Sequence, residues 1–179
     1  IISRGSLRLI ISHYLCIPPK NIIFSYNAYQ KPYLENNPLN FNTSHSGDFI
    51  IHAFTINANI GIDIEQLNLD LDFLLLAQTT CTELEYKQLS KLSSEDRALA
   101  FYRLWTRKEA FVKAIGKGLH YPLTDFEVSF LPTEKAKILN IVSDPSETNF
   151  WQLEEIILES NCIATIATRQ CYDEIQFFN

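Results

Sequence analysis

The sequence lacks methionine altogether and begins at Ile1, although it is 179 residues long. A natural chain of this length normally has an initiator methionine and several more, so we expect that an N-terminal segment is missing and that methionines were replaced or dropped. No apolar run approaches the roughly 20 residues of a membrane span. No basic and apolar segments of a secretory signal open the chain. These absences favour a cytoplasmic protein.

Cysteine is scarce and unpatterned. The four cysteines, Cys16, Cys81, Cys162 and Cys171, form no C-x-x-C pair, so a zinc site or a dithiol motif has little support. We expect reduced thiols that are mostly buried. The four histidines show no H-x-x-x-H spacing. Basic residues are in the minority, and the formal net charge of -6 argues against broad binding to nucleic acid. A local basic pocket or a bound cation could still accept an anionic ligand.

The residues that are present describe an ordinary globular chain, with 46% hydrophobic and 20% charged residues. Hydrophobic periodicity predicts helices over about 3–15, 70–91 and 94–115 and β-type runs over 22–26, 49–56, 60–65, 126–130, 137–142, 151–158, 162–168 and 175–178. This order indicates an α+β fold in two halves that meet near residues 57–59. The strands FIIHAFTI and CIATIATR resemble each other, which is weak evidence for a duplication.

The stretch from Phe101 to Leu119, FYRLWTRKEAFVKAIGKGL, is the most informative part of the chain. It is typical of the end of a long helix that begins near Ser94 and stops at a left-handed glycine. Trp105, Glu109 and Lys113 are spaced i, i+4 and i+8, which places them in one row on one helix face. Taken alone, the row could be an aromatic packing residue, the role we assign to Trp105, beside a solvated Glu–Lys pair.

A second candidate stretch is the strand IGIDIE at residues 60–65. Its three isoleucines point to one side, and Asp63 and Glu65 point to the other. The simplest interpretation is a half-buried strand with a wet acidic face. Two carboxylates on one face nevertheless repel each other unless a cation lies between them, and hard oxygen ligands of this kind suit Mg²⁺.

The third candidate stretch is FNTSHSGD, residues 41–48, which precedes a predicted strand. We expect Ser44, His45 and Ser46 to lie in a turn whose backbone N–H groups and hydroxyls could hold a phosphate. An ordinary polar turn would have the same composition. Glycosylation at Asn42 needs secretion, for which there is no signal. A Ser44 nucleophile is disfavoured because no G-x-S-x-G elbow surrounds it.

Four motifs now occur in a fixed order: K-P at residues 31–32, N-x-S-H at 42–45, G-I-D-I-E at 61–65 and W-x-x-K-E-x-x-x-K at 105–113. Each is weak alone, but together they resemble the 4′-phosphopantetheinyl transferases of the surfactin-synthetase-activating type. The resemblance implies an α+β fold built as a pseudo-twofold duplication of two similar halves. It divides the chain into an incomplete N-terminal half, residues 1–58, and a C-terminal half, residues 59–179, that carries the metal-binding motifs.

The resemblance also implies roles for the acidic residues and one lysine. Asp63 and Glu109 would ligate Mg²⁺, with Glu65 as a third and more variable ligand. Glu109 would also accept the proton of the attacking hydroxyl. Lys113 would contact the pyrophosphate of coenzyme A and stabilise the departing nucleotide. Asp63, Glu109 and Lys113 are therefore the expected catalytic residues.

The remaining expected contacts are to the nucleotide part of coenzyme A. Ser44 and His45 would bind its phosphates, with His45 at the 3′-phosphate. Lys31 would line the adenine and 3′-phosphate side of the cleft. Members of the family often have glycine before the Lys-Pro pair, whereas this chain has Gln30.

The activity implied is transfer of the phosphopantetheine group from coenzyme A to a serine of an acyl or peptidyl carrier protein, with Mg²⁺ as cofactor and 3′,5′-ADP as the other product. We expect a cytoplasmic monomer that binds neither nucleic acid nor membrane. Two alternatives stay open. One is another Mg²⁺-dependent phosphotransferase or nuclease, and the other is a non-catalytic module that binds coenzyme A or carrier protein.

Overall fold

The computed structural model describes residues 2–158, 161–169 and 174–178, which form an α+β fold of helices and small antiparallel sheets. The helices are α1 (Ile2–Leu15), α2 (Phe73–Thr80), α3 (Glu83–Ser90) and α4 (Ser94–Ile115). Short 3-10 turns are η1 (Pro19–Asn21), η2 (Gly118–His120), η3 (Leu123–Asp125) and η4 (Pro145–Phe150). The strands are β1 (Ser25–Tyr26), β2 (Pro32–Tyr33), β3 (Leu39–Ser46), β4 (Phe49–Ile56), β5 (Ile60–Gln66), β6 (Phe126–Val128), β7 (Ile138–Ile141), β8 (Gln152–Ile157) and β9 (Cys162–Thr168).

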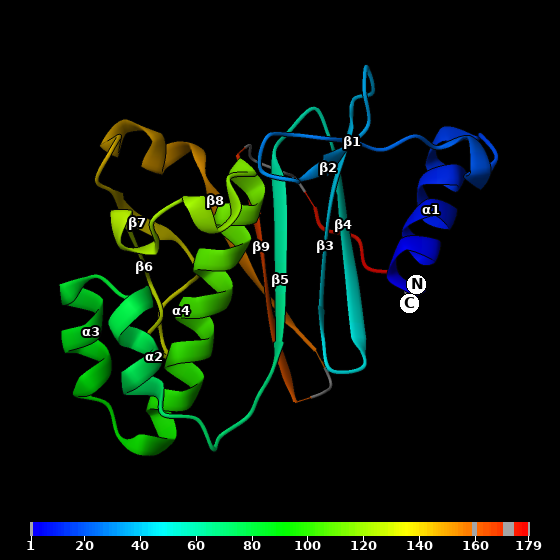
Figure 1. The fold of residues 1–179 in the computed structure, drawn as a ribbon. Coiled ribbons are helices and arrows are strands. Elements are labelled where there is room, and N and C mark those ends of the chain that lie inside the picture. Colours follow the sequence, from blue (N-terminus) through cyan, green and yellow to red (C-terminus); the bar gives the residue numbers. More distant parts are fainter. Residues whose placement is uncertain (1, 159–160, 170–173, 179) are drawn as a thin grey trace.

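Within the described ranges the strands form four antiparallel units. β3 and β4 make a hairpin, β5, β9 and β8 make a three-stranded sheet in that order, and β1–β2 and β6–β7 are two-stranded. Figure 1 shows α4 against the β5–β9–β8 sheet, with α2, α3, β6 and β7 beyond it, while the β3–β4 hairpin and α1 lie on the opposite side. β5 therefore stands between the helical layer and the hairpin, where residues from both can converge.

Local signals explain the long helix α4. The Ser93 hydroxyl accepts a hydrogen bond from the backbone N–H of Asp96, so the helix is capped one residue before the expected position. Glu95 and Asp96 complement the positive end of the helix dipole. Gly116 ends the helix in the left-handed conformation, with φ +72°. The predicted helix over 94–115 is confirmed at both ends.

Glycine at position 61 lets α4 and β5 approach closely. A Cβ atom on Gly61 would lie 2.0 Å from the carbonyl oxygen of Ala110 and 2.4 Å from the backbone nitrogen of Ala114. Side chains cannot occupy this space, because backbone atoms of the helix fill it. The close approach brings the face of β5 that carries Asp63 directly against α4.

Several predicted elements differ from the structure. The helix expected over 70–91 is two helices, because Thr82 forms a capping box with Glu85 and starts a new helix. The run over 22–26 contributes only Ser25–Tyr26 to a strand. Residues 175–178 form no strand. The strands over 49–56, 60–65 and 162–168 are confirmed.

The segment with Ser44, His45 and Ser46 is a further correction. These residues lie in β3, not in a turn, and only Gly47 and Asp48 connect β3 to β4. Gly47 has φ +54°, the left-handed conformation that such a tight hairpin connection requires. Because the turn is so short, the polar residues before it remain paired with β4.

The cysteines are partly as expected. Cys81 and Cys162 are buried free thiols, whereas Cys16 is exposed, and Cys171 lies outside the described residues. Burial raises the pKa of the Cys81 thiol to about 11. As far as the chain is described, none of its helices is long and apolar enough to cross a membrane.

Candidate active site

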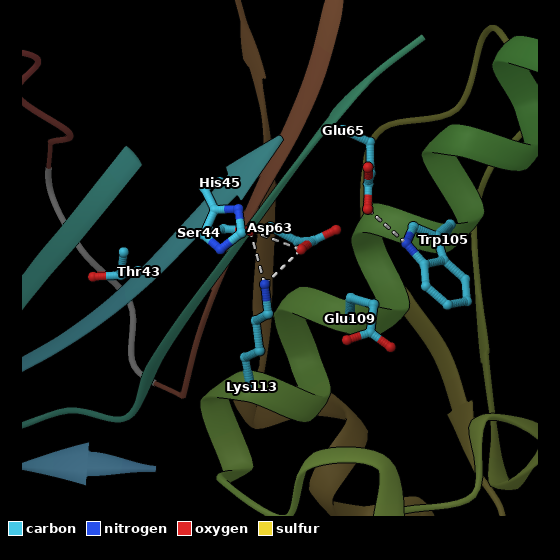
Figure 2. A pocket seen from close by; sticks show the side chains of 8 residues that line it. All are labelled: Thr43, Ser44, His45, Asp63, Glu65, Trp105, Glu109 and Lys113. Atoms are coloured by element: carbon cyan, nitrogen blue, oxygen red, sulfur yellow. Dashed lines mark hydrogen bonds and ion pairs between the residues drawn. The ribbon is translucent and has the colours of Figure 1, made fainter. Parts of the chain in front are cut away.

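A pocket of about 270 Å³ lies where β3, β5 and α4 meet. Figure 2 shows the eight residues that line it: Thr43, Ser44, His45, Asp63, Glu65, Trp105, Glu109 and Lys113. Six of the seven expected site residues are therefore brought together from three separate stretches of sequence. The row of Trp105, Glu109 and Lys113 on α4 faces the two carboxylates of β5, as the helical spacing predicted.

Side chains of β3 form a regular junction with the backbone of β5. Asn42, Ser44 and Ser46 alternate along β3 and accept hydrogen bonds from the backbone N–H groups of residues 62, 64 and 66, at 2.9, 3.3 and 3.0 Å. The two serines also donate to the carboxylates of β5. Ser44 Oγ donates to Asp63 Oδ1 and Ser46 Oγ donates to Glu65 Oε2, each at 3.0 Å. The hairpin thus sets the direction of both acidic side chains.

Lys113 joins this network from α4. Its ammonium lies 2.6 Å from Asp63 Oδ1 and donates to Ser44 Oγ at 2.9 Å. The Ser44 hydroxyl therefore donates its proton to Asp63 and accepts from both Lys113 and the backbone of residue 64. Ser44 is buried and fully engaged within the protein, so a phosphate could take its hydroxyl only by displacing one of these partners.

The two expected principal metal ligands share an unusual environment. Asp63 Oδ2 and Glu109 Oε1 are buried atoms with no hydrogen-bond partner among the described residues. Burial raises the pKa of Asp63 to about 6, although Lys113 opposes the shift. Burial, followed by repulsion from Asp63, also raises the pKa of Glu109. Unpaired buried carboxylate oxygens are costly, and a cation that both could ligate would relieve that cost.

The donor set fits a hard divalent cation, because it consists of carboxylate oxygens beside open pocket space. Within the described ranges, however, no three histidine, cysteine or acidic side chains are close enough together to form a metal site as they stand. Two carboxylates with a phosphorylated ligand are a usual environment for Mg²⁺, which keeps several of its waters. The residues therefore fit Mg²⁺ as a partner of a ligand rather than as an ion held by the protein alone.

Glu65 is held differently from the other two acidic residues. Its Oε1 accepts a hydrogen bond from the indole Nε1–H of Trp105 at 3.2 Å, and its Oε2 accepts the bond from Ser46. Trp105 is half-buried and stacks on Phe101, with the ring centroids 6.3 Å apart, so the expected packing role is accompanied by a polar one. Sequence spacing placed Trp105 on the correct helix face but could not show that its N–H reaches β5.

Lys31, the seventh expected residue, does not line the pocket. Its ammonium donates to the backbone carbonyls of Ile60, Lys113 and Ala114 at 2.9, 2.7 and 3.0 Å. All three N–H bonds are used, at the C-terminal end of α4 where a positive charge is favourable. Burial lowers the pKa of Lys31 to about 8. The side chain of Asn27 reinforces this junction by donating to the carbonyl of Gly116 at 2.8 Å.

Sequence reasoning missed a buried polar cluster around the residue that precedes Glu109. The ammonium of Lys108, which precedes Glu109, lies 2.7 Å from Glu85 Oε2 and donates to the carbonyls of Leu123 and Phe126. Lys108 has no exposed surface. Nothing in the sequence indicated that Glu85, besides its part in the capping box of α3, neutralises a buried lysine. This cluster ties α3 and the β6 region to the helix that carries the site.

A pocket with buried carboxylates and a lysine is of the kind that enzymes use for phosphorylated ligands together with a divalent cation. Comparison with known proteins specifies the class. Residues 59–167 match the family model described as the 4′-phosphopantetheinyl transferase superfamily, and residues 1–57 match the one described as 4′-phosphopantetheinyl transferase, N-terminal.

Individual proteins are also similar to this chain. The chain is 35% identical over 168 residues to the 4′-phosphopantetheinyl transferase HetI of Nostoc sp. (strain PCC 7120), covering 92% of this chain and 68% of the relative. It is 37% identical over 124 residues to the 4′-phosphopantetheinyl transferase Sfp of Bacillus subtilis (strain 168), covering 68% of this chain and 54% of the relative. It is similar in structure to a holo-(acyl-carrier-protein) synthase from Bacillus anthracis, with a TM-score of 0.48 and 23% identity over 63% of this chain and 96% of that chain.

The chain belongs to the 4′-phosphopantetheinyl transferase superfamily. The resemblance inferred from the four motifs is therefore confirmed. The chain spans about half to two thirds of the length of the relatives it matches.

Proposed function

We propose that this protein transfers the 4′-phosphopantetheine group of coenzyme A to a serine hydroxyl of an acyl or peptidyl carrier protein and releases 3′,5′-ADP. The observation that carries the proposal is the pair of unpaired, buried carboxylate oxygens, Asp63 Oδ2 and Glu109 Oε1, beside the ammonium of Lys113 in one pocket. Membership of the family and the order of the four motifs support the choice of substrates.

In this proposal Asp63 and Glu109 would hold Mg²⁺, with Glu65 as the third acidic group. When bound, the ion would neutralise negative charge that develops on the pyrophosphate oxygens during phosphoryl transfer. Glu109 accepts the proton of the carrier-protein hydroxyl. The new serine O–P bond forms as the phosphoanhydride bond breaks.

Lys113 and His45 act on the nucleotide. The Lys113 ammonium lies at the pocket and supplies positive charge for the departing 3′,5′-ADP, while His45 is exposed on the pocket lining, where its ring can reach a phosphate. Ser44 serves this site by orienting Asp63 and Lys113 through its hydroxyl. Lys31 supports the site without lining it, because its ammonium donates hydrogen bonds to backbone carbonyls at the start of β5 and near the C-terminal end of α4.

The division into two halves at residues 58 and 59 is part of the proposal. It is supported by the ranges of the two family matches, 1–57 and 59–167. We also propose that the protein is a cytoplasmic monomer, which sedimentation and cell fractionation would test.

The deciding experiment incubates the chain with coenzyme A, Mg²⁺ and an apo carrier protein and measures the mass of the carrier protein. We expect the mass increase of one phosphopantetheine group, lost when Mg²⁺ is chelated. A coenzyme A binding module would bind the cofactor without that increase, and a nuclease would cleave nucleic acid instead. Either result would contradict the proposal.

A further inference from the structure

Glu65 is the one pocket carboxylate for which both oxygens are hydrogen-bonded by neutral donors of the described chain. One donor, Ser46, comes from the β3–β4 hairpin, and the other, Trp105, comes from α4. Asp63 is different, because it is paired with the ammonium of Lys113. Glu109 is different as well, because one of its oxygens has no partner.

We propose that Ser46 and Trp105 are positioning residues that hold the Glu65 carboxylate toward the divalent cation shared by Asp63 and Glu109. The inference rests on the proposed function for the presence of that cation. It adds a role for the indole N–H of Trp105 and for the hydroxyl of Ser46, neither of which needs to touch a substrate.

Both donors are themselves fixed in direction, which is what a positioning role requires. Ser46 Oγ accepts a hydrogen bond from the backbone N–H of Gln66 at 3.0 Å, so its proton is directed to Glu65. The indole ring of Trp105 is stacked on Phe101 with an interplanar angle of 17°, so its N–H cannot swing away freely. Glu65, a side chain with three rotatable bonds, is thereby confined to one orientation.

The chemistry of the donors matters as much as their geometry. A neutral N–H or O–H orients a carboxylate without cancelling its charge, whereas an ammonium would cancel it. Glu65 forms no ion pair with a basic side chain in the described part of the chain. Its negative charge thus stays available to an ion in the pocket, and each oxygen keeps a further lone pair. Groups that orient metal ligands in this way commonly affect metal affinity by about 10- to 100-fold.

The test measures binding of Mn²⁺, in the presence of coenzyme A, by counting the free ion from its paramagnetic resonance signal. The single variants are Trp105→Phe, Ser46→Ala and Glu65→Gln. Trp105→Phe keeps an aromatic ring on Phe101 but removes the N–H. Two double variants combine Glu65→Gln with Trp105→Phe or with Ser46→Ala. Trp151→Phe and Ser143→Ala serve as matched controls, because both positions lie outside the pocket lining.

We expect Mn²⁺ affinity to fall about tenfold in Trp105→Phe and in Ser46→Ala, and to stay unchanged in both controls. Once Glu65→Gln is present, adding either change should weaken binding no further, because their effect passes through the carboxylate. Unchanged affinity in both single variants, or losses that simply add to that of Glu65→Gln, would overturn the positioning role alone. Failure of the unmodified protein to bind Mn²⁺ would contradict the proposed function and this inference together.

Discussion

The ammonium of Lys113 lies 2.6 Å from Asp63 Oδ1, in the position where a cation bound by that carboxylate would have to compete with it. The Asp63 side chain is almost entirely buried, so the interaction is only weakly screened by water. Lys113 is thus the counter-ion of the acidic pocket before any ligand enters, and the phosphates of a ligand would offer it an alternative partner.

This relationship predicts opposite effects of one substitution on two measurements. In Lys113→Met the affinity for Mn²⁺ alone should rise about five- to tenfold, because a resident positive charge has gone. Phosphopantetheine transfer should fall sharply, because the leaving nucleotide loses its cation. Calorimetry and the mass assay measure the two quantities. Lys117→Met, which removes an exposed lysine just after the helix, is the control. Weaker Mn²⁺ binding in Lys113→Met would exclude the competition.

Asp63→Ala and Glu109→Ala should each reduce transfer by more than about 100-fold, because even residues that merely orient metal ligands are worth 10- to 100-fold. Circular dichroism should show an intact fold. The free energy of unfolding of Glu109→Gln should equal that of the unmodified protein or exceed it by about 1 kcal/mol, because an unpaired buried charge disappears. Normal turnover in either alanine variant would refute the site.

The raised pKa of Asp63 predicts how cation binding depends on pH. The carboxylate loses its charge as the pH falls through about 6. Below that value proton and cation compete, so the affinity for Mn²⁺ should drop about tenfold per pH unit. Above pH 7 the affinity should be nearly constant with respect to this group. Asp63→Asn should flatten the acidic side of the profile. An unmodified profile that stays flat down to pH 4.5 would mean that Asp63 does not bind the ion.

The close approach of β5 and α4 gives a prediction about stability. Gly61→Ala should destabilise the protein by about 3 kcal/mol, because the new methyl group meets helix backbone at 2.0 Å. Gly5→Ala is the matched control in α1, where nothing lies within 4 Å of the added Cβ. Alanine there should be neutral or stabilising by up to about 1 kcal/mol. Urea denaturation compares the two, and equal stabilities would contradict the packing.

Substitution of Lys31 distinguishes a structural role from direct binding of coenzyme A. The three carbonyls that it bonds predict that Lys31→Met lowers the free energy of unfolding by about 1–3 kcal/mol. Affinity for coenzyme A should change less than it does in His45→Ala, because His45 lines the pocket and Lys31 does not. The exposed Lys20→Met is the stability control. If Lys31→Met kept full stability and lost coenzyme A binding, the direct ligand role expected from the sequence would be correct.

Local sequence determined the ends of α4, the faces of β5 and the family. A serine cap and a left-handed glycine bound α4 through contacts within a turn of each end, so both ends could be placed to within one residue without knowing the fold, although the cap is Ser93 and not Ser94. Alternation along β5 separated the isoleucines from Asp63 and Glu65 for the same reason, because side chains of a strand alternate whatever surrounds it. The order of the four motifs was sufficient to indicate the family, which the comparisons confirm.

Tertiary structure decided what each of those side chains does. Ser44 and Lys31 were expected to bind phosphates. Instead, their hydrogen-bond donors are used by groups 19 to 83 residues away in the chain. A pattern within a short segment cannot indicate contacts at such separations. The same holds for the indole of Trp105, which bonds a carboxylate 40 residues before it. Residue types and their periodicity are properties of short segments, whereas pairing, burial and the resulting shifts in pKa exist only once β3, β5 and α4 are packed together.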